Sequence, residues 1–495
     1  MPGCPLLDNF REHILMTSML KLKKLPYLLS GVGLSTLSLV ASAGDWIISP
    51  AVTLEQTYTD NALLSNDDPE SESVTVVSPS ISAYREGARA SLDFNYAPEY
   101  RYYWQDTEDD ELVNFLRAEG DVELMEDHIF LDGWATADLT TITSSGGTGI
   151  GGLSGLDETT EVYTVGASPY FRSRLGNVSL FEARYTLDTV LYDDGDLDES
   201  VGQRVDLVLG SGPAFTSQIW EISAFANQVD YDSQDEDNEV SQVRAELAQQ
   251  LTRQWALAFA AGYEDYDLVL NEDFDGSLWS VGIIYTPNIR TRLALGGGER
   301  AFGDDYYLDF SHSSRRTVWT ANYSRDFTSA RDELLRPTLF QRQDAFGNLI
   351  RDAVLESPPD VDREGGPAIN AEYYELESFS TSFTFVASRT VFTLSASRDD
   401  RTYETATPDT QDIYAVARLS RDISQKTNAY LRLSRSDHEE EGLDYDEWVV
   451  ALGGSYQLGP RTSLGARLAR LDREGEIDTE TYDENSFSIY FTSTF

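Results

Sequence analysis

The side chains that most often carry catalysis are scarce in this sequence. The histidines beyond residue 43 are His128, His312 and His438. The only cysteine of the sequence, Cys4, lies before that residue. The segment from Ser436 to Glu439 holds residue types that serve as a hydrolase base or a metal ligand, but no second histidine lies near it. We therefore interpret His438 as part of a solvated loop and predict no catalytic residue, no cofactor and no enzyme activity.

Two acidic runs have the carboxylate density that Ca²⁺ binding requires. They lack the ligand spacing of a defined calcium loop, so we favour solvated loops that hold divalent ions diffusely and bridge them to lipopolysaccharide. The weak calcium candidates are Asp193, Asp194, Asp196, Asp198, Asp232, Asp235 and Asp237.

The formal net charge of −48 excludes one large class of partner. A body of that charge repels a polyanion, so we expect no binding to nucleic acid. The one lysine beyond residue 43 is Lys426, which means that nearly all other cations there are arginines.

A leader with three parts occupies residues 19–43. Lys21, Lys23 and Lys24 precede an apolar stretch, and Ala41-Ser42-Ala43 is a typical cleavage site. We predict a signal peptide over 19–43, a start-site extension over 1–18 and a secreted mature part over 44–495.

The mature part alternates apolar and polar residues in segments of the length that tilted membrane strands require. Tyr185 and Leu187, for example, alternate with Glu182 and Arg184. The polar face carries arginines that could either line a selective passage or fill a closed interior with ion pairs. These predicted lumen residues are Arg184, Arg244, Arg418, Arg432 and Arg467.

The connections between these segments alternate in length, which a soluble β-sandwich does not require. Short turns are expected near 85–87, 174–177, 210–213, 252–254, 287–290, 388–390, 422–426 and 459–461, and longer acidic loops at 61–73, 144–158, 193–200, 232–239, 437–446 and 472–484. This plan predicts an all-β fold, a single transmembrane antiparallel barrel of about 22 strands with short periplasmic turns and long extracellular loops. A long insert at 329–371 forms either a loop, which we favour, or an inward plug.

The chain ends in a pattern typical of barrels that the outer-membrane assembly machinery recognises. Its apolar positions are Phe487, Ile489, Phe491 and Phe495, although Ser493 departs from the pattern. We expect the assembly machinery, membrane lipid and lipopolysaccharide as partners in the outer membrane of a Gram-negative cell.

The opening of the mature part resembles the PEP-CTERM system-associated outer-membrane proteins, which are similar to β-barrel porins of exopolysaccharide loci. The resemblance rests on Trp46, Pro50, Tyr58, Thr59, Asp60 and Asn61, and it is sharpest over 46–64. It implies a Gram-negative envelope with surface polysaccharide and sorted proteins, and it supplies no catalytic residues. Our first hypothesis is a porin-like or export channel tied to exopolysaccharide or surface-protein secretion. The alternative is a non-conducting anchor whose acidic surface loops bind glycans, cations or sorted proteins.

Overall fold

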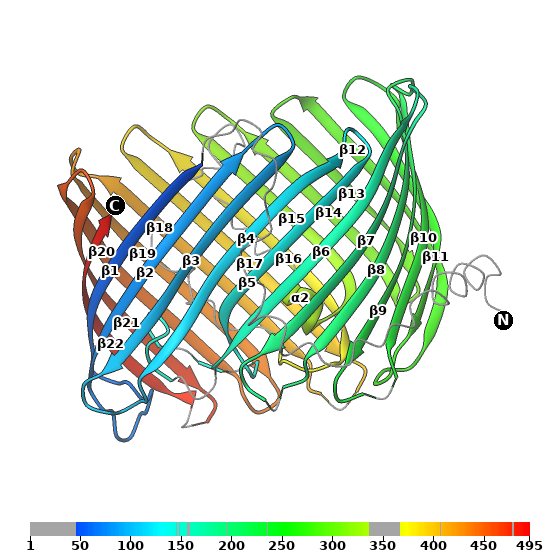
Figure 1. Cartoon of the computed structure of the whole chain (residues 1–495). Coiled ribbons are helices and arrows are strands. Elements are labelled where there is room, and N and C mark those ends of the chain that lie inside the picture. Colours follow the sequence, from blue (N-terminus) through cyan, green and yellow to red (C-terminus); the bar gives the residue numbers. More distant parts are fainter. Residues whose placement is uncertain are drawn as a thin grey trace.

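The computed structural model describes residues 46–335 and 367–495, apart from 145, 148, 156–158, 196, 235, 406, 478 and 479. The predicted leader and start-site extension lie outside these residues. Strands make up almost all of the described chain (Figure 1). No helix within it has the length and apolar character needed to cross a membrane.

Within the described residues the strands follow one another along the chain, with one short helix among them. Their bounds are β1(Ile47–Thr59), β2(Glu72–Glu86), β3(Ala90–Tyr103), β4(Glu111–Met125), β5(Ile129–Thr141), β6(Thr159–Leu175), β7(Ser179–Tyr192), β8(Ser200–Ser211), β9(Gln218–Tyr231), β10(Asn238–Gln250), β11(Trp255–Asp267), β12(Phe274–Asn288), β13(Thr291–Arg300), β14(Gly303–Ser313), β15(Thr317–Ser329), α2(Ala330–Leu335), β16(Tyr373–Val386), β17(Thr390–Tyr403), β18(Thr410–Asp422), β19(Thr427–Glu440), β20(Tyr445–Gly459), β21(Thr462–Gly475) and β22(Tyr482–Thr494).

The sheet closes on itself because its first and last strands pair. Each strand is antiparallel to the next along the chain, and β1 also pairs with β22, from Ala51 opposite Thr494 to Thr59 opposite Ser486. Closure leaves no unpaired strand edge, which is what a sheet surrounded by hydrocarbon requires. The predicted antiparallel barrel of about 22 strands is confirmed as a 22-stranded sheet.

The two rims of the barrel differ as the sequence predicts. We call the rim with the short connections the turn end and the opposite rim the loop end. At the turn end β6 and β7 are joined by 176–178, where Gly176 takes the left-handed φ of 62° that favours glycine. The loop end carries most of the longer connections. Exceptions there are Ala301 and Phe302, which alone join β13 to β14, and 441–444 between β19 and β20, where the longer loop 437–446 was expected.

Each strand presents an apolar face to the outside. On β20, Trp448, Val450 and Leu452 are about half exposed, whereas Val449 and Ala451 between them are buried. The same alternation leaves Leu54, Leu187 and Leu468 exposed on other strands. A ring of large exposed apolar side chains would be unfavourable in water and is stable in lipid.

Candidate functional site

Two segments from the loop end fold into the barrel interior and define its candidate functional site. We call the described residues of 142–155, between β5 and β6, the inner loop. We call α2, between β15 and β16, the inner helix; it lies within the barrel in Figure 1.

A single carboxylate holds the inner loop against the seam between β1 and β22. Glu484 is almost completely buried and accepts hydrogen bonds from Thr59 Oγ1 (2.6 Å), the Ile150 backbone N–H (2.7 Å) and Ser154 Oγ (3.2 Å). Three hydrogen bonds converge on this one buried side chain, so Glu484 is the principal polar anchor of this loop.

The inner loop also packs on both sides of that seam. Arg101 Nη1 donates to the Gly152 carbonyl at 2.9 Å, and Tyr103 Oη donates to the Leu153 carbonyl at 3.3 Å. Ile150 joins an apolar cluster with Leu64, Val449, Ala451, Ala469, Leu471 and Tyr482, and Leu153 joins one with Val74, Val76 and Tyr103.

This course corrects the expectation that 144–158 is an extracellular loop, for the described part of that segment. Its apolar residues Ile150 and Leu153 gain burial inside the barrel, and glycines allow the tight path. Gly151, Gly152 and Gly155 all have φ between 64° and 77°.

The inner helix is tied to two separate parts of the barrel wall by charges of opposite sign. Arg331 forms an ion pair with Asp188 on β7 and donates to Ser200 Oγ on β8 at 2.8 Å. Glu333 lies 3.2 Å from Arg401 on β17 and accepts from Tyr374 Oη on β16 at 2.6 Å.

The start of the inner helix follows from its sequence. Ser329 Oγ accepts the Asp332 N–H at 3.2 Å, and Asp332 and Glu333 place negative charge in the first turn, where it is stabilising. Leu334, Leu335 and Ile369 then pack on Val162, Val190 and Tyr192. The described ends of the 329–371 insert therefore lie inward, and residues 336–366 lie outside the described chain.

Buried tyrosines gather where strands reach the loop end, a feature that the sequence analysis missed. Many stand directly before an acidic residue, and this repeated pair was the available signal. The tyrosines are Tyr103, Tyr192, Tyr231, Tyr266, Tyr373, Tyr374, Tyr403, Tyr445 and Tyr482. Together with the inner segments they narrow the interior at this end.

The predicted lumen arginines all lie on the face opposite the exposed apolar one, but spread around the wall. Arg184 lies 2.7 Å from Asp132 and 3.3 Å from Glu182, and Arg244 lies 2.6 Å from Glu246.

The other three arginines contact neighbours of differing kinds. Arg467 lies 3.7 Å from Glu55, Arg432 donates to Tyr414 Oη at 2.9 Å, and the Arg418 guanidinium stacks 5.2 Å from the Tyr430 ring centroid. The wall therefore presents locally paired charges beside aromatic rings.

The acidic runs stay in loop-end connections and contact each other. Asp198 accepts a hydrogen bond from Ser233 at 2.7 Å, and Asp237 accepts one from Gln228 at 2.5 Å. Burial, and then the nearby Asp232 carboxylate, raise the pKa of Glu199 above its usual value. Asp196 and Asp235 lie outside the described residues, and among the described ones no three potential ligands gather as a metal site would require.

The prediction that His438 lies in a solvated loop is wrong. His438 belongs to β19 and is buried, with Nδ1 2.6 Å from Asp412 and Nε2 3.4 Å from Glu440. His128 stays in a turn, and His312 on β14 contacts Thr291 at 2.8 Å.

The residues that carry the family resemblance fasten the seam of the barrel. Asp60 accepts two hydrogen bonds from Asn485, at 2.7 and 2.9 Å, and Asn61 donates to the Asp483 carbonyl at 2.9 Å. Thr59 points inward to Glu484, whereas Tyr58 is exposed on the outer face.

The start of β1 and the end of β22 meet at the turn end of this seam. The Pro50 carbonyl accepts the Phe495 N–H at 2.9 Å. Pro50 has no N–H of its own, but it precedes the first β1–β22 pair, so the ladder lacks no donor there. Trp46 lies under the Arg85 guanidinium at 5.2 Å. The exposed Phe487, Ile489 and Phe495 continue the outer apolar face, and Phe491 is half-buried on the same face.

The sequence matches no protein-family model and no curated protein. Among solved structures the barrel is similar to the siderophore receptor PirA from Acinetobacter baumannii, with 8% identity over 90% of this chain and 80% of that one and a TM-score of 0.50. It is also similar to the ferric-catecholate import receptor Fiu from E. coli K12, with 7% identity, the same 90% of this chain, 81% of that one and a TM-score of 0.50. At such identities the likeness concerns the fold, and with the closed sheet and its apolar outer face it makes this chain an outer-membrane β-barrel.

Proposed function

We propose that this barrel is a porin-like or export channel whose passage is restricted by the inner loop and the inner helix. Two observations together carry the proposal. The interior wall presents paired charges, and two segments lie in the interior without becoming part of the sheet. A barrel of 22 strands is too wide for its own wall side chains to fill. The space left must hold water, the inner segments or a solute.

The way in which the inner segments are held supports passage through the barrel. The inner helix is attached through Arg331 and Glu333, and the inner loop through Glu484 and two apolar clusters, and none of these contacts belongs to the β-ladder. The β-ladder does not have to break for either segment to leave the interior. The passage can therefore open while the barrel stays intact.

The charge of the protein sets the selectivity that we expect. A formal net charge of −48 and acidic connections at the loop end repel anions at the entrance. Arg184 and Arg244 are each paired with carboxylates, so they add little attraction for anions. We expect cations and neutral saccharides to pass more readily than anions.

The cargo belongs to the same proposal. The resemblance of the opening segment to PEP-CTERM system-associated proteins favours exopolysaccharide or a secreted surface protein as what the channel serves. Gene neighbours for polysaccharide synthesis and export would support this setting.

Conductance in planar bilayers tests the channel directly. We expect small or infrequent currents from the whole protein and larger, cation-selective currents after residues 330–371 are replaced by a short turn. A matched control shortens the acidic connection 232–237, in which Ser233 contacts Asp198 of the neighbouring connection, and is expected to behave as the whole protein does. Persistent absence of conductance in all three forms would refute the channel.

A second candidate is a non-conducting anchor, and the closed packing at the loop end favours it. Tyr231 packs with Ala371 from the β15–β16 connection. The ring centroids of Tyr266 on β11 and Phe327 on β15 are 5.4 Å apart. Side chains from strands that are not neighbours therefore meet at this end. If the barrel is only an anchor, removing the acidic connections 193–199 and 232–237 abolishes retention of surface polymer. Conductance is then absent from every form of the protein.

A further inference from the structure

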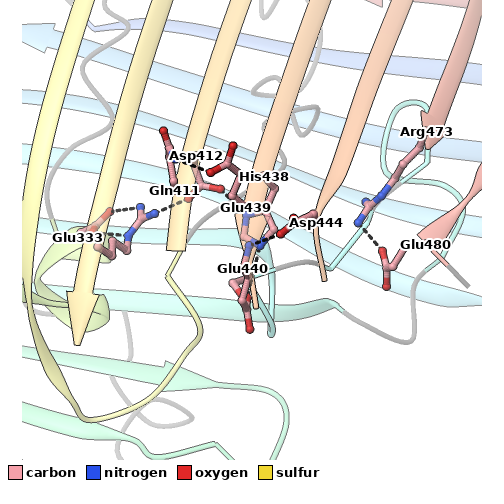
Figure 2. A network of polar contacts seen from close by, with 11 residues as sticks. Glu333, Gln411, Asp412, His438, Glu439, Glu440, Asp444, Arg473 and Glu480 are labelled. Atoms are coloured by element: carbon pink, nitrogen blue, oxygen red, sulfur yellow. Dashed lines mark hydrogen bonds and ion pairs between the residues drawn. The ribbon is translucent and has the colours of Figure 1, made fainter. Parts of the chain in front are cut away.

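A continuous line of polar contacts along the inner wall joins the inner helix to the inner loop. It begins at Glu333 of the inner helix, which lies 3.2 Å from Arg401 on β17. Arg401 forms an ion pair with Asp412 on β18, and the other oxygen of Asp412 lies 2.6 Å from His438 Nδ1 on β19. Figure 2 shows Glu333, Asp412 and His438 along this line.

The line ends on the inner loop. His438 Nε2 lies 3.4 Å from Glu440, and the same Glu440 oxygen accepts a hydrogen bond from Ser144 Oγ. We call the contacts from Glu333 through Arg401, Asp412, His438 and Glu440 to Ser144 the wall relay. Its members come from the inner helix, three adjacent strands and the inner loop.

The wall relay is shielded from water at its centre. Arg401 and His438 are each about 1% exposed, and the His438 ring stacks on Tyr445 with 5.0 Å between centroids. The Arg473 guanidinium carbon also lies over the Tyr445 ring, 3.5 Å from its centroid. Buried polar groups of this kind cannot exchange partners with water, so a change at one end alters the contacts available at the other.

A second contact ties the inner loop to the far end of the β15–β16 connection. The Ile369 N–H donates to the Ile142 carbonyl at 3.1 Å. Ile369 and Leu334 of the inner helix both pack against the cluster of Val162, Val190 and Tyr192. The inner loop is therefore joined to the inner helix through the wall relay, and it also contacts the connection that contains this helix.

We propose that the wall relay couples the inner helix to the inner loop, so that release of one favours release of the other. Glu333 is the end that moves with the helix, and Ser144 is the end that moves with the loop. His438 is a positioning residue between them, because its ring contacts both Asp412 and Glu440. The physiological meaning of this coupling rests on the proposed channel, but the coupling itself can be measured without any current.

Hydrogen exchange of the purified, folded barrel tests the coupling. The readout is the exchange of 149–155, where the Ile150 N–H is bonded to Glu484 and the Gly155 N–H to the Ala62 carbonyl. Glu333→Gln keeps the shape of the side chain and removes the charge that Arg401 binds. We expect exchange in 149–155 to become about three- to tenfold faster, although Glu333 contacts none of these residues.

Two further variants locate the path. His438→Gln breaks the wall relay at its centre and is expected to speed exchange of 149–155 by a similar factor. Adding Glu333→Gln to His438→Gln should then change the exchange of 149–155 little further. The matched control is Glu264→Gln, because Glu264, like Glu333, lies close to an arginine, 2.7 Å from Arg300, but is not in the wall relay.

The coupling is overturned if Glu333→Gln speeds exchange in 331–335 and leaves 149–155 at the wild-type rate. It is also overturned if Glu264→Gln speeds exchange of 149–155 as much as Glu333→Gln does. Full additivity of Glu333→Gln and His438→Gln would remove His438 from the path. Failure of the barrel to conduct would contradict the proposed channel and leave the exchange result unaffected.

Discussion

Glu484→Gln is expected to release the inner loop while the barrel remains folded. The glutamate side chain accepts three hydrogen bonds, from Thr59, Ile150 and Ser154, at 2.6, 2.7 and 3.2 Å. Glutamine has one carbonyl oxygen in place of two carboxylate oxygens. Its NH₂ group would face a hydrogen-bond donor that the second carboxylate oxygen now accepts from. A buried donor left without an acceptor costs about 1–3 kcal/mol, so we expect a net loss of about 2–3 kcal/mol for the seated loop.

That loss corresponds to about a 30- to 150-fold rise in the ratio of released to seated loop. Thermolysin cleaves before Ile and Leu, so limited proteolysis at Ile150 and Leu153 reports how often the loop is released. When closing is fast relative to cleavage, the rate of cleavage follows that population. The barrel should stay folded because its strands are held by the ladder and not by Glu484.

Asp483→Asn is the matched control, since Asp483 is the neighbouring residue and points outward. Its side chain is 58% exposed and lies 3.5 Å from Arg470, an arrangement that contributes less than about 1 kcal/mol. Thermolysin should cleave this variant at the wild-type rate. Equal cleavage of Glu484→Gln and Asp483→Asn, or unfolding of the whole barrel in Glu484→Gln, would refute the reasoning.

Three further outcomes are expected. Leu468→Arg, on the outer face, should lower the free energy of unfolding by about 2–4 kcal/mol in urea titrations in lipid. Arg467→Leu, on the inner face, should lower it by less than about 1 kcal/mol. Equal losses in the two variants would contradict the assigned faces. Phe495→Ala should reduce the fraction of folded barrel in outer-membrane preparations without changing the unfolding midpoint of the purified protein, and an unchanged folded fraction would speak against an assembly signal. Isothermal titration with Ca²⁺ should show no saturable binding, and saturable binding that Asp198→Asn removes would establish a specific site instead.

The strands could be predicted because alternation survives wherever one face meets lipid. Leu187 beside Arg184, or Leu468 beside Arg467, shows the period plainly, and short turns mark the strand ends opposite the long loops. The side of the wall on which the arginines lie follows from the same period. The strand count could be approximated because both termini of the barrel meet at one seam.

The loop end could not be predicted in the same way, since both faces of a strand are polar there. Ser436 to Glu440 reads as a loop from its composition, yet these residues continue β19 and bury His438. Ladder hydrogen bonds to β18 and β20 extend the strand without any apolar signal. The alternation of apolar and polar residues that reveals a strand inside the membrane is absent where the strand extends beyond it.

The candidate site depended on contacts that sequence spacing does not encode. Ser144 meets Glu440, and Arg331 meets Asp188, across long stretches of chain. Apolar residues among glycines, at Ile150 and Leu153, were the one local sign that the inner loop seeks burial. Nothing comparable marks Arg331 or Glu333 as anchors.

The pairing of β1 with β22 sets the order in which this molecule can be made. Neither strand has its second neighbour until β22 has been synthesised, so a sheet without β22 has two unpaired edges. Hydrocarbon does not tolerate such edges, so insertion and closure must occur nearly together. A chain stopped before β22 is therefore expected to be degraded as a whole instead of persisting as a smaller pore.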